Sequence, residues 1–220
     1  MVKSGWNFIL PLSLLGSVLL WQSGHCCHAP LQALGWLCLA LAAFCVNFFR
    51  DPSRSIPSDA SLIVSPADGK VIAIEEVDDA HVGKAHEIRI FLNVFNVHVQ
   101  RNPFTVPTNV EGTRYFAGKF LAASAPKASL DNEQHWIRLR SADGAPVVVK
   151  QIAGLIARRI VSWVRPGDQV AGGQHIGLIQ FGSQVDLVLP RAWAVRVKIG
   201  DKVKGGESVL AKRPSAKGRK

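Results

Sequence analysis

The sequence VRPGDQVAGG at residues 164–173 recurs as VKIGDKVKGG at residues 197–206. Each copy places valines around a central Gly-Asp pair and closes on two glycines. Gly-Asp pairs between alternating apolar residues favour tight turns that join antiparallel strands. The repeat therefore predicts two β-hairpins of one kind, and a related element begins at the SPADGKV sequence of residues 65–71.

The rest of the chain after residue 62 consists of short β-type runs separated by Gly, Pro and Asp. The runs cover residues 71–74, 88–92, 94–99, 136–139, 147–152, 160–164, 176–179 and 185–188. Short alternating strands with regular turns predict a mainly β domain, a sandwich or barrel, over residues 63–211. Its hairpins resemble those of lipoyl and biotinyl domains, which have a barrel-sandwich hybrid fold.

Two apolar runs precede this domain, at about residues 6–21 and 31–49. Each approaches the roughly 20 residues that a helix needs to span a bilayer. Only a short loop separates them, without a convincing signal-peptide cleavage site, so we expect a retained α-helical membrane hairpin over residues 1–50. The first run is short and contains Pro11, which leaves a re-entrant hairpin open as an alternative.

Basic residues around the apolar runs indicate how the hairpin is oriented. Lys3 precedes the first run, and Arg50 and Arg54 follow the second. The positive-inside rule then places both ends in the cytoplasm, with the β domain on the cytoplasmic face of the inner membrane. A Pro-rich linker covers residues 51–62. The basic tail of residues 212–220 is expected to be disordered, and it serves either an anionic membrane surface or solubility alone.

Composition argues against two other classes of protein. The net charge of +10 could suggest nucleic acid, but no nucleic-acid-binding signature is present and the basic residues do not alternate with aromatic ones. The β domain has no cysteine and needs no disulfides. We expect no metal site, because the adjacent thiols of the His25-Cys26-Cys27-His28 cluster lack the C-x-x-C spacing of zinc ligands.

The FGSQVD sequence of residues 181–186 lies between the two repeat copies and contains a Gly-Ser pair. Most such pairs in β-rich sequences are turns. In a tight hairpin, however, the hydroxyl of Ser183 can attack the carbonyl of Gly182, and β-elimination from the resulting ester leaves a chain that starts with a pyruvoyl group. A serine hydroxyl is a weak nucleophile, so this chemistry also requires a base and a group that orients the base.

Four sequence motifs in order, behind a membrane anchor, resemble the phosphatidylserine decarboxylase proenzymes of the short, archaeal-type subfamily. They are FFRDP at 48–52, SPADGKV at 65–71, FLNVFNVHV at 91–99 and FGS at 181–183. The resemblance implies self-cleavage between Gly182 and Ser183. It also implies a β chain of residues 1–182 and an α chain of residues 183–220 that stay together as a heterodimer, with a higher oligomer left open.

The resemblance also implies which residues carry out the chemistry. Asp68 orients His98, His98 deprotonates Ser183, and Ser183 becomes the pyruvoyl cofactor. His98 is also a candidate to protonate the product, although an ordered water could do so. A second histidine found in long-form bacterial members is replaced by Phe95 here, so its role cannot be transferred.

The implied reaction is decarboxylation of phosphatidylserine to phosphatidylethanolamine and CO2. The pyruvoyl carbonyl condenses with the substrate amine and accepts the electrons released when CO2 leaves. Arg101, Arg158 and Arg159 are candidates to bind the phosphate or carboxylate, since a guanidinium matches those groups bidentately. They could equally be ordinary strand-edge charges.

Two other functions fit part of the pattern. A membrane-anchored lipoyl-like adaptor without activity would share the anchor and the Gly-Asp turns, but it needs a long helical hairpin that the sequence does not show. A serine hydrolase would use the same three residues, but the G-x-S-x-G motif is absent. Both alternatives predict a chain that stays intact.

Overall fold

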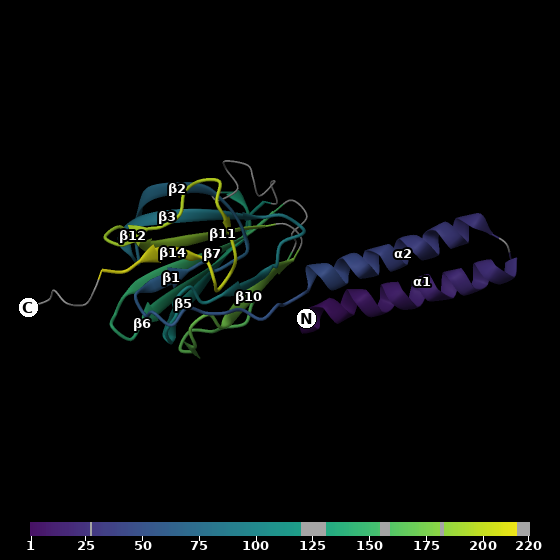
Figure 1. Cartoon of the computed structure of the whole chain (residues 1–220), viewed down its shortest axis with the longest axis horizontal. Helices are drawn as coiled ribbons and strands as arrows, with labels where there is room; N and C mark the ends of the chain where they lie inside the picture. Colours follow the sequence, from purple (N-terminus) through teal and green to yellow (C-terminus); the bar gives the residue numbers. More distant parts are fainter. Residues whose placement is uncertain (27, 120–130, 155–158, 181–182, 215–220) are drawn as a thin grey trace, which may run out of the picture. The chain divides into compact units, whose positions relative to one another are not determined.

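The computed structural model describes residues 1–26, 28–119, 131–154, 159–180 and 183–214. The chain divides into two compact units, Met1–Ser53 and Arg54–Lys220 (Figure 1). The first unit is helical and the second is built mainly of strands. The fold class expected from the sequence is thus confirmed.

The helical unit is an antiparallel pair of apolar helices. A short 3-10 helix, η1 (Lys3–Gly5), leads into α1 (Trp6–Cys26), and α2 (Ala29–Phe48) follows. Both helices are long and apolar enough to cross a membrane. They approach closely where Gly16 faces Gly35, since a Cβ added to Gly16 would lie 3.0 Å from the Gly35 carbonyl oxygen.

α1 is longer than the apolar run that predicts it, because the helix continues beyond Trp21. The polar groups of this last part find partners within the helix: Ser23 Oγ donates to the Leu20 carbonyl at 2.8 Å, and His25 Nδ1 lies 2.8 Å from the Trp21 carbonyl oxygen. Pro11 lies near the start of α1 and does not end it.

The β unit contains fourteen strands among its described residues. They are β1 (Leu62–Val64), β2 (Gly69–Asp79), β3 (Gly83–Leu92), β4 (Val99–Arg101), β5 (Thr108–Phe116), β6 (Gln134–Ser141), β7 (Pro146–Ala153), β8 (Arg159–Ser162), β9 (Gln169–Val170), β10 (His175–Gln180), β11 (Ser183–Pro190), β12 (Ala194–Val195), β13 (Lys202–Val203) and β14 (Val209–Lys212).

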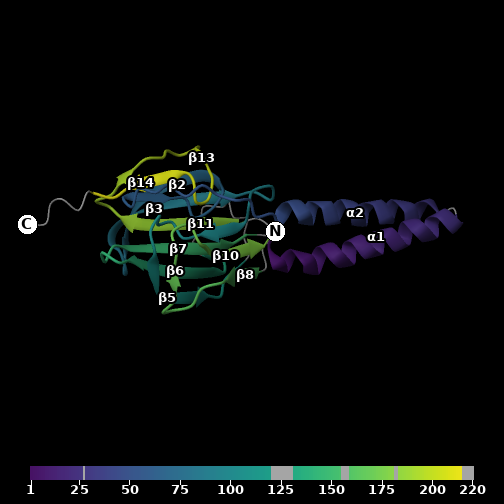
Figure 2. The same ribbon diagram turned by 60° about the horizontal axis from the view of Figure 1, so that its bottom comes forward.

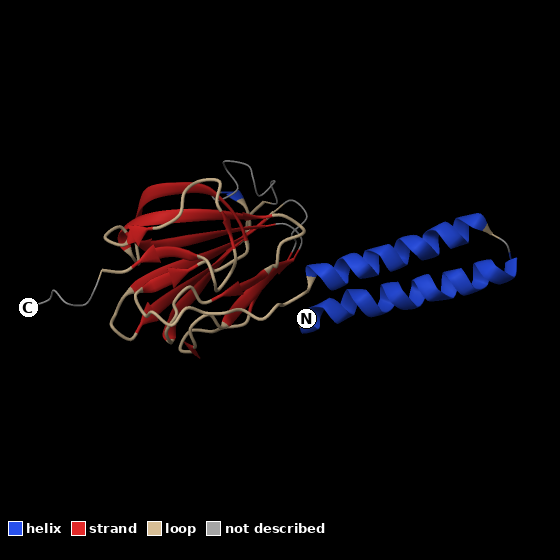
Figure 3. Ribbon diagram, viewed as in Figure 1, coloured by secondary structure: helices blue, strands red, loops and turns tan. Residues whose placement is uncertain are grey.

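Eight of these strands form one curled, antiparallel sheet in the order β13-β2-β3-β11-β7-β6-β5-β9 (Figure 2). Two three-stranded sheets, β4-β10-β8 and β1-β14-β12, complete the unit. Figure 3 shows how strands dominate it. One face of the curled sheet carries the main core, which includes Ile90, Val149 and Val185. We call this the core face, and the opposite side of the same sheet the outer face.

The two repeat copies form equivalent turns. Gly167 and Gly200 take positive φ values of 93° and 101°, which favour glycine. The prediction of two β-hairpins is wrong, however, because the strand after each turn does not pair with the strand before it. β9 pairs with β5, and β13 pairs with β2. The register of β5 shifts at Val110 and that of β2 shifts at Val71. The backbone N–H and carbonyl groups of these two valines therefore form hydrogen bonds with the Gly-Asp turns.

Candidate active site

Ser183 is the first residue of β11 and lies between two other strands of the curled sheet. It pairs with Leu92 of β3 and with Ala153 of β7. Side chains alternate along a strand, so Ser183 shares the core face with Val185. The residue is fully buried, and its Oγ makes no hydrogen bond with any described residue.

A buried hydroxyl without a partner typically costs about 1–3 kcal/mol, and such groups in native structures point to a function. The position of Ser183 therefore supports chemistry over a simple turn. Gly182, the other half of the expected cleavage site, lies outside the described residues.

His98 is also fully buried and immediately precedes β4. Its Nδ1 lies 2.9 Å from the backbone carbonyl oxygen of Asn96. A carbonyl can only accept, so Nδ1 carries the hydrogen and the lone pair of the neutral ring is on Nε2. The imidazole is thus in the tautomer that a base at Nε2 requires.

The sheet β4-β10-β8 places His98 near the segment that leads to Ser183. Val99 pairs with Leu178 of β10, and the Ile179 N–H points to the His98 carbonyl at 3.4 Å. β10 ends at Gln180, three residues before Ser183. His98 therefore lies beside the strand that ends next to the expected cleavage site.

A chain of buried polar side chains runs from His98 across the core face. Gln100 Nε2 donates to the His98 carbonyl at 2.6 Å, and Gln151 Nε2 donates to Gln100 Oε1 at 2.9 Å. At its far end, His135 Nδ1 lies 3.1 Å from Gln151 Oε1 and donates to it. Burial lowers the pKa of His135, which favours a neutral ring.

No motif marks these polar residues as site residues, although one signal for them exists in the sequence. Along β7 the core-facing positions are Val147, Val149, Gln151 and Ala153. A glutamine in a row of core positions is a buried polar group that needs partners. Gln151 also faces the same side as Ser183, one core-facing position along β7 from the Ala153 that pairs with it.

Asp68 has partners other than His98. Both of its carboxylate oxygens accept from Arg54 Nη2, at 3.0 and 2.9 Å, and Oδ1 also accepts from the Gly205 N–H at 2.7 Å. The Nδ1 hydrogen bond expected from Asp68 is made instead by the Asn96 carbonyl. The buried guanidinium of Arg54 requires a carboxylate, which accounts for this choice.

Asp68 is nevertheless linked to the strand that follows His98. Its turn contains Pro66, whose carbonyl accepts the N–H of Arg101 in β4 at 2.8 Å. The turn and β4 are thus held together by a backbone hydrogen bond, three residues from His98.

The candidate binding arginines are only partly described. Arg101 is half-buried, and its Nη1 donates to the Gly173 carbonyl at 3.3 Å. Arg159 is exposed and pairs with Gln180 at the end of β10. Arg158 lies outside the described residues. Within the described part of the chain, no group of three or more His, Cys, Asp or Glu residues could hold a metal ion.

Comparison with known proteins gives one consistent family. A family model described as phosphatidylserine decarboxylase matches residues 41–211. A phosphatidylserine decarboxylase proenzyme of Nitrosomonas eutropha is 43% identical over 95% of this chain and 93% of its own length. Proteins of the same description from Paraburkholderia phymatum and Burkholderia pseudomallei are each 40% identical, over 95% and 96% of this chain and 95% and 94% of their own lengths.

Proposed function

The chain belongs to the phosphatidylserine decarboxylase family, and we propose that it converts phosphatidylserine to phosphatidylethanolamine and CO2 by means of a pyruvoyl group made from its own Ser183. The similarity extends along nearly the whole chain, and the relatives are described as proenzymes. The observation that carries the pyruvoyl part is the buried Oγ of Ser183, which no described residue binds.

Self-cleavage begins with proton transfer from Ser183 Oγ to Nε2 of His98. The oxygen then attacks the carbonyl carbon of Gly182, the Gly182–Ser183 amide bond breaks, and the serine nitrogen takes a proton. Loss of the Ser183 α-proton expels Gly182 as a carboxylate. The dehydroalanine that remains tautomerises, and one water hydrolyses it to the pyruvoyl group with release of ammonia.

The described residues support these reaction steps in different ways. The Asn96 carbonyl keeps the lone pair of His98 on Nε2, and Gln100 binds the His98 carbonyl, so the imidazole is held from two sides. We keep Asp68 in the proposal as a positioning residue. It acts through its turn, which is fixed by Arg54 and Gly205 and bonded to β4.

For decarboxylation, the pyruvoyl carbonyl supplies the acceptor for the electrons released with CO2. Arg101 and Arg159, with Arg158, are the residues we assign to the substrate phosphate or carboxylate, because guanidinium groups bind both bidentately. His98 is the group we assign to hold the proton that the α carbon receives.

The two apolar helices support a membrane location, which suits a lipid substrate. We propose that the β unit faces the cytoplasm at the inner membrane, from the positive-inside rule. The subunits are residues 1–182 and 183–220 held together by β11, whose neighbours β3 and β7 belong to the larger chain. We assign the chain to the short, archaeal-type subfamily from its four motifs and from Phe95, which stands where long-form members have a second histidine.

Denaturing electrophoresis of the purified chain tests the proposal. The wild type should give two fragments, and mass spectrometry should show the smaller one to be lighter than a chain starting with Ser183 by the mass of ammonia. Ser183→Ala should stay intact, whereas the control Ser61→Ala, at a half-buried turn serine, should cleave normally. An intact wild type would rule out the pyruvoyl mechanism and favour the adaptor or hydrolase alternatives.

A further inference from the structure

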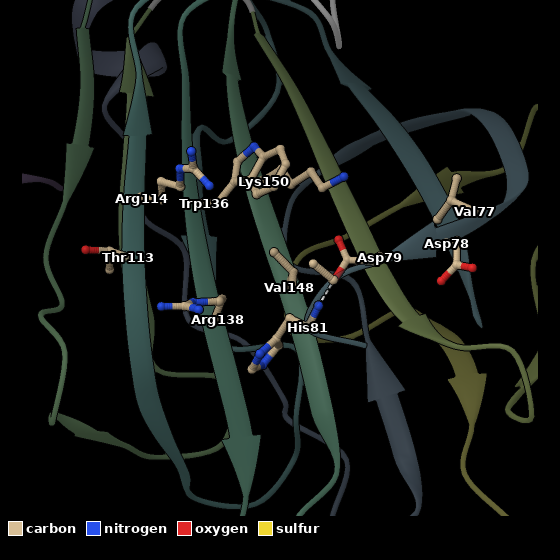
Figure 4. Close-up of a pocket in the computed structure, with 11 residues that line it drawn as sticks. Val77, Asp78, Asp79, His81, Thr113, Arg114, Trp136, Arg138, Val148 and Lys150 are labelled. Carbon is tan, nitrogen blue, oxygen red and sulfur yellow. Dashed lines mark hydrogen bonds between the residues drawn. The ribbon is translucent and has the colours of Figure 1, made fainter. Parts of the chain in front are cut away.

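The outer face of the curled sheet has a cavity that the proposed reaction does not use. Its volume is about 520 Å³, and Figure 4 shows the side chains around it. Trp136 and Arg138 of β6 line it, and they alternate with the core residue Ile137. The cavity is therefore on the opposite side of the sheet from Ser183.

Two arginines lie along one edge of this cavity, with the Arg138 guanidinium over Gly112 and the Arg114 guanidinium 4.6 Å from the Phe116 ring centroid. Arg138 pairs with Gly112 of β5, and Arg114 is two residues further along β5 and so faces the same side. A Cβ added to Gly112 would lie 2.1 Å from Arg138 Nη2, so the glycine makes room for the guanidinium. Figure 4 shows both arginines on the side away from Asp78.

Neither guanidinium has a carboxylate partner among the described residues. The neighbouring cations do: Arg140 pairs with Glu111, and Lys150 Nζ lies 2.6 Å from Glu87 Oε1. Glu111, the carboxylate that interacts electrostatically with Arg138, also lies 3.1 Å from His81. The stretches outside the described residues contain no Asp or Glu in the sequence, so they have no acidic side chain to offer.

The remaining walls combine an apolar surface with charged groups, which include the carboxylates of Asp78 and Asp79. Trp136 and Val148 form an apolar surface, and the ammonium of Lys150 lies 4.5 Å from the Trp136 ring centroid. Burial lowers the pKa of His81, so this residue adds little charge at neutral pH. Asp79 accepts the N–H groups of His81 and Val82 and shapes the β2–β3 turn.

We propose that this cavity binds a phosphate ester, with the phosphate on Arg114 and Arg138 and the apolar part of the ligand against Trp136 and Val148. Each guanidinium can donate bidentate hydrogen bonds to phosphate oxygens, and a Trp wall suits carbon atoms next to the phosphate. The same chemistry occurs in lipid headgroups and in soluble phosphate esters. The proposal does not depend on Ser183 or on decarboxylation.

Calorimetric titration of the full-length chain in detergent micelles distinguishes the two sources. One arm uses dihexanoyl phosphatidylglycerol, which lacks the amine needed for decarboxylation, and the other uses glycerol phosphate. We expect at least one ligand to bind. Binding of the lipid alone assigns the cavity to a headgroup with its carbon chain, and binding of both assigns it to phosphate esters in general.

The variants assign the binding to this cavity. Arg114→Gln with Arg138→Gln should weaken binding about tenfold or more. The control pair Arg165→Gln and Arg196→Gln, which removes the same charge from exposed positions elsewhere, should change it less than twofold. Gly112→Ala keeps every charge but displaces Arg138, and it should also weaken binding. Absence of binding, or equal losses in both double variants, would overturn the proposal.

Discussion

After Ser183, the proposed self-cleavage depends most on His98, whose imidazole acts as the base. Positioned general bases contribute roughly 10²–10⁴-fold to rate. His98→Gln should therefore slow cleavage by about that factor, measured as the half-time of fragment appearance after cell-free synthesis. His86→Gln, in β3, is the control. Cleavage of the His98 variant at the wild-type rate would remove this residue from the mechanism.

The contacts of Asp68 allow a sharper test of its role. If Asp68 acts by holding its turn together with Arg54, then Asp68→Asn and Arg54→Gln should each slow cleavage, and the double variant should be no slower than the worse single variant, because the two residues act as one unit. Direct orientation of His98 by Asp68 gives a different result: Arg54→Gln would then leave the rate unchanged or raise it. The same fragment assay distinguishes the two.

Local motifs single out Ser183 and His98, whose catalytic roles stay predictions. Ser183 stands in its motif at the start of β11, and both it and His98 are fully buried. The partner of Asp68 is not predictable from the sequence, because the local pattern marks Arg54 only as a charge beside the membrane. A pair between a linker arginine and a turn carboxylate depends on how the chain folds back, which a local pattern does not show.

At the scale of elements, β11 carries different chemistry on its two faces. Its core face begins with Ser183, and its outer face carries Asp186, which is fully buried and lies opposite Arg89 of β3 and Lys150 of β7 in the strand register. Gln184 Nε2 donates to Asp186 Oδ1 at 2.7 Å, while Oδ2 has no partner among the described residues. Burial, followed by the charge of Glu87, raises the pKa of Asp186 to about 7.

This raised pKa predicts a pH dependence of stability. An acid whose pKa is higher in the folded state binds more protons when folded, so its effect is to lower the free energy of unfolding as the pH rises from about 3.8 to about 7. The loss is at most roughly 4 kcal/mol, since one pKa unit corresponds to about 1.4 kcal/mol.

Urea unfolding of the uncleaved Ser183→Ala chain at pH 5 and pH 8 measures this effect. Asp186→Asn in that background should reduce the loss of stability between the two pH values. The control Asp78→Asn, at an exposed position, should not. An unchanged pH dependence in the Asp186 variant would mean that the carboxyl titrates near its ordinary value when folded.

The repeat shows what an element-level pattern can and cannot predict. Both Gly-Asp turns form as expected. They are alike in detail, because the carboxylates of Asp168 and Asp201 each accept a hydrogen bond from the backbone N–H three residues earlier. The sequence does not predict which strands pair with the repeat copies. Pairing depends on irregularities at Val71 and Val110, where β2 and β5 shift register, and nothing in those residues themselves marks a bulge.

For the whole molecule, the boundary between the two units decides what each can do without the other. The second unit begins at Arg54 and contains Ser183, His98 and Asp68. Its first residues are packed into it: Ile56 lies so close to Gly173 and Gly206, the last glycines of the two repeat copies, that a Cβ on either would collide with it. The linker is therefore part of the β unit's packing at Arg54 and Ile56.

This boundary predicts different outcomes for two truncations. A chain starting at residue 50 keeps Arg54 and Ile56 and should still cleave itself. It should decarboxylate short-chain phosphatidylserine in solution but act poorly on vesicles, because the apolar helices are gone. A chain starting at residue 58 lacks Arg54, which binds Asp68, and also lacks Ile56, which packs into the β unit. Its cleavage should therefore be slower.

Fragment analysis and CO2 release from the two substrates measure these outcomes, with circular dichroism to confirm that both chains fold. Equal cleavage by the two truncated chains would show that Arg54 does not position Asp68. Failure of the longer one to cleave, although folded, would mean that the helices contribute to the proenzyme itself and not only to reaching the lipid. The two results concern different residues, so each part of the proposal can be rejected separately.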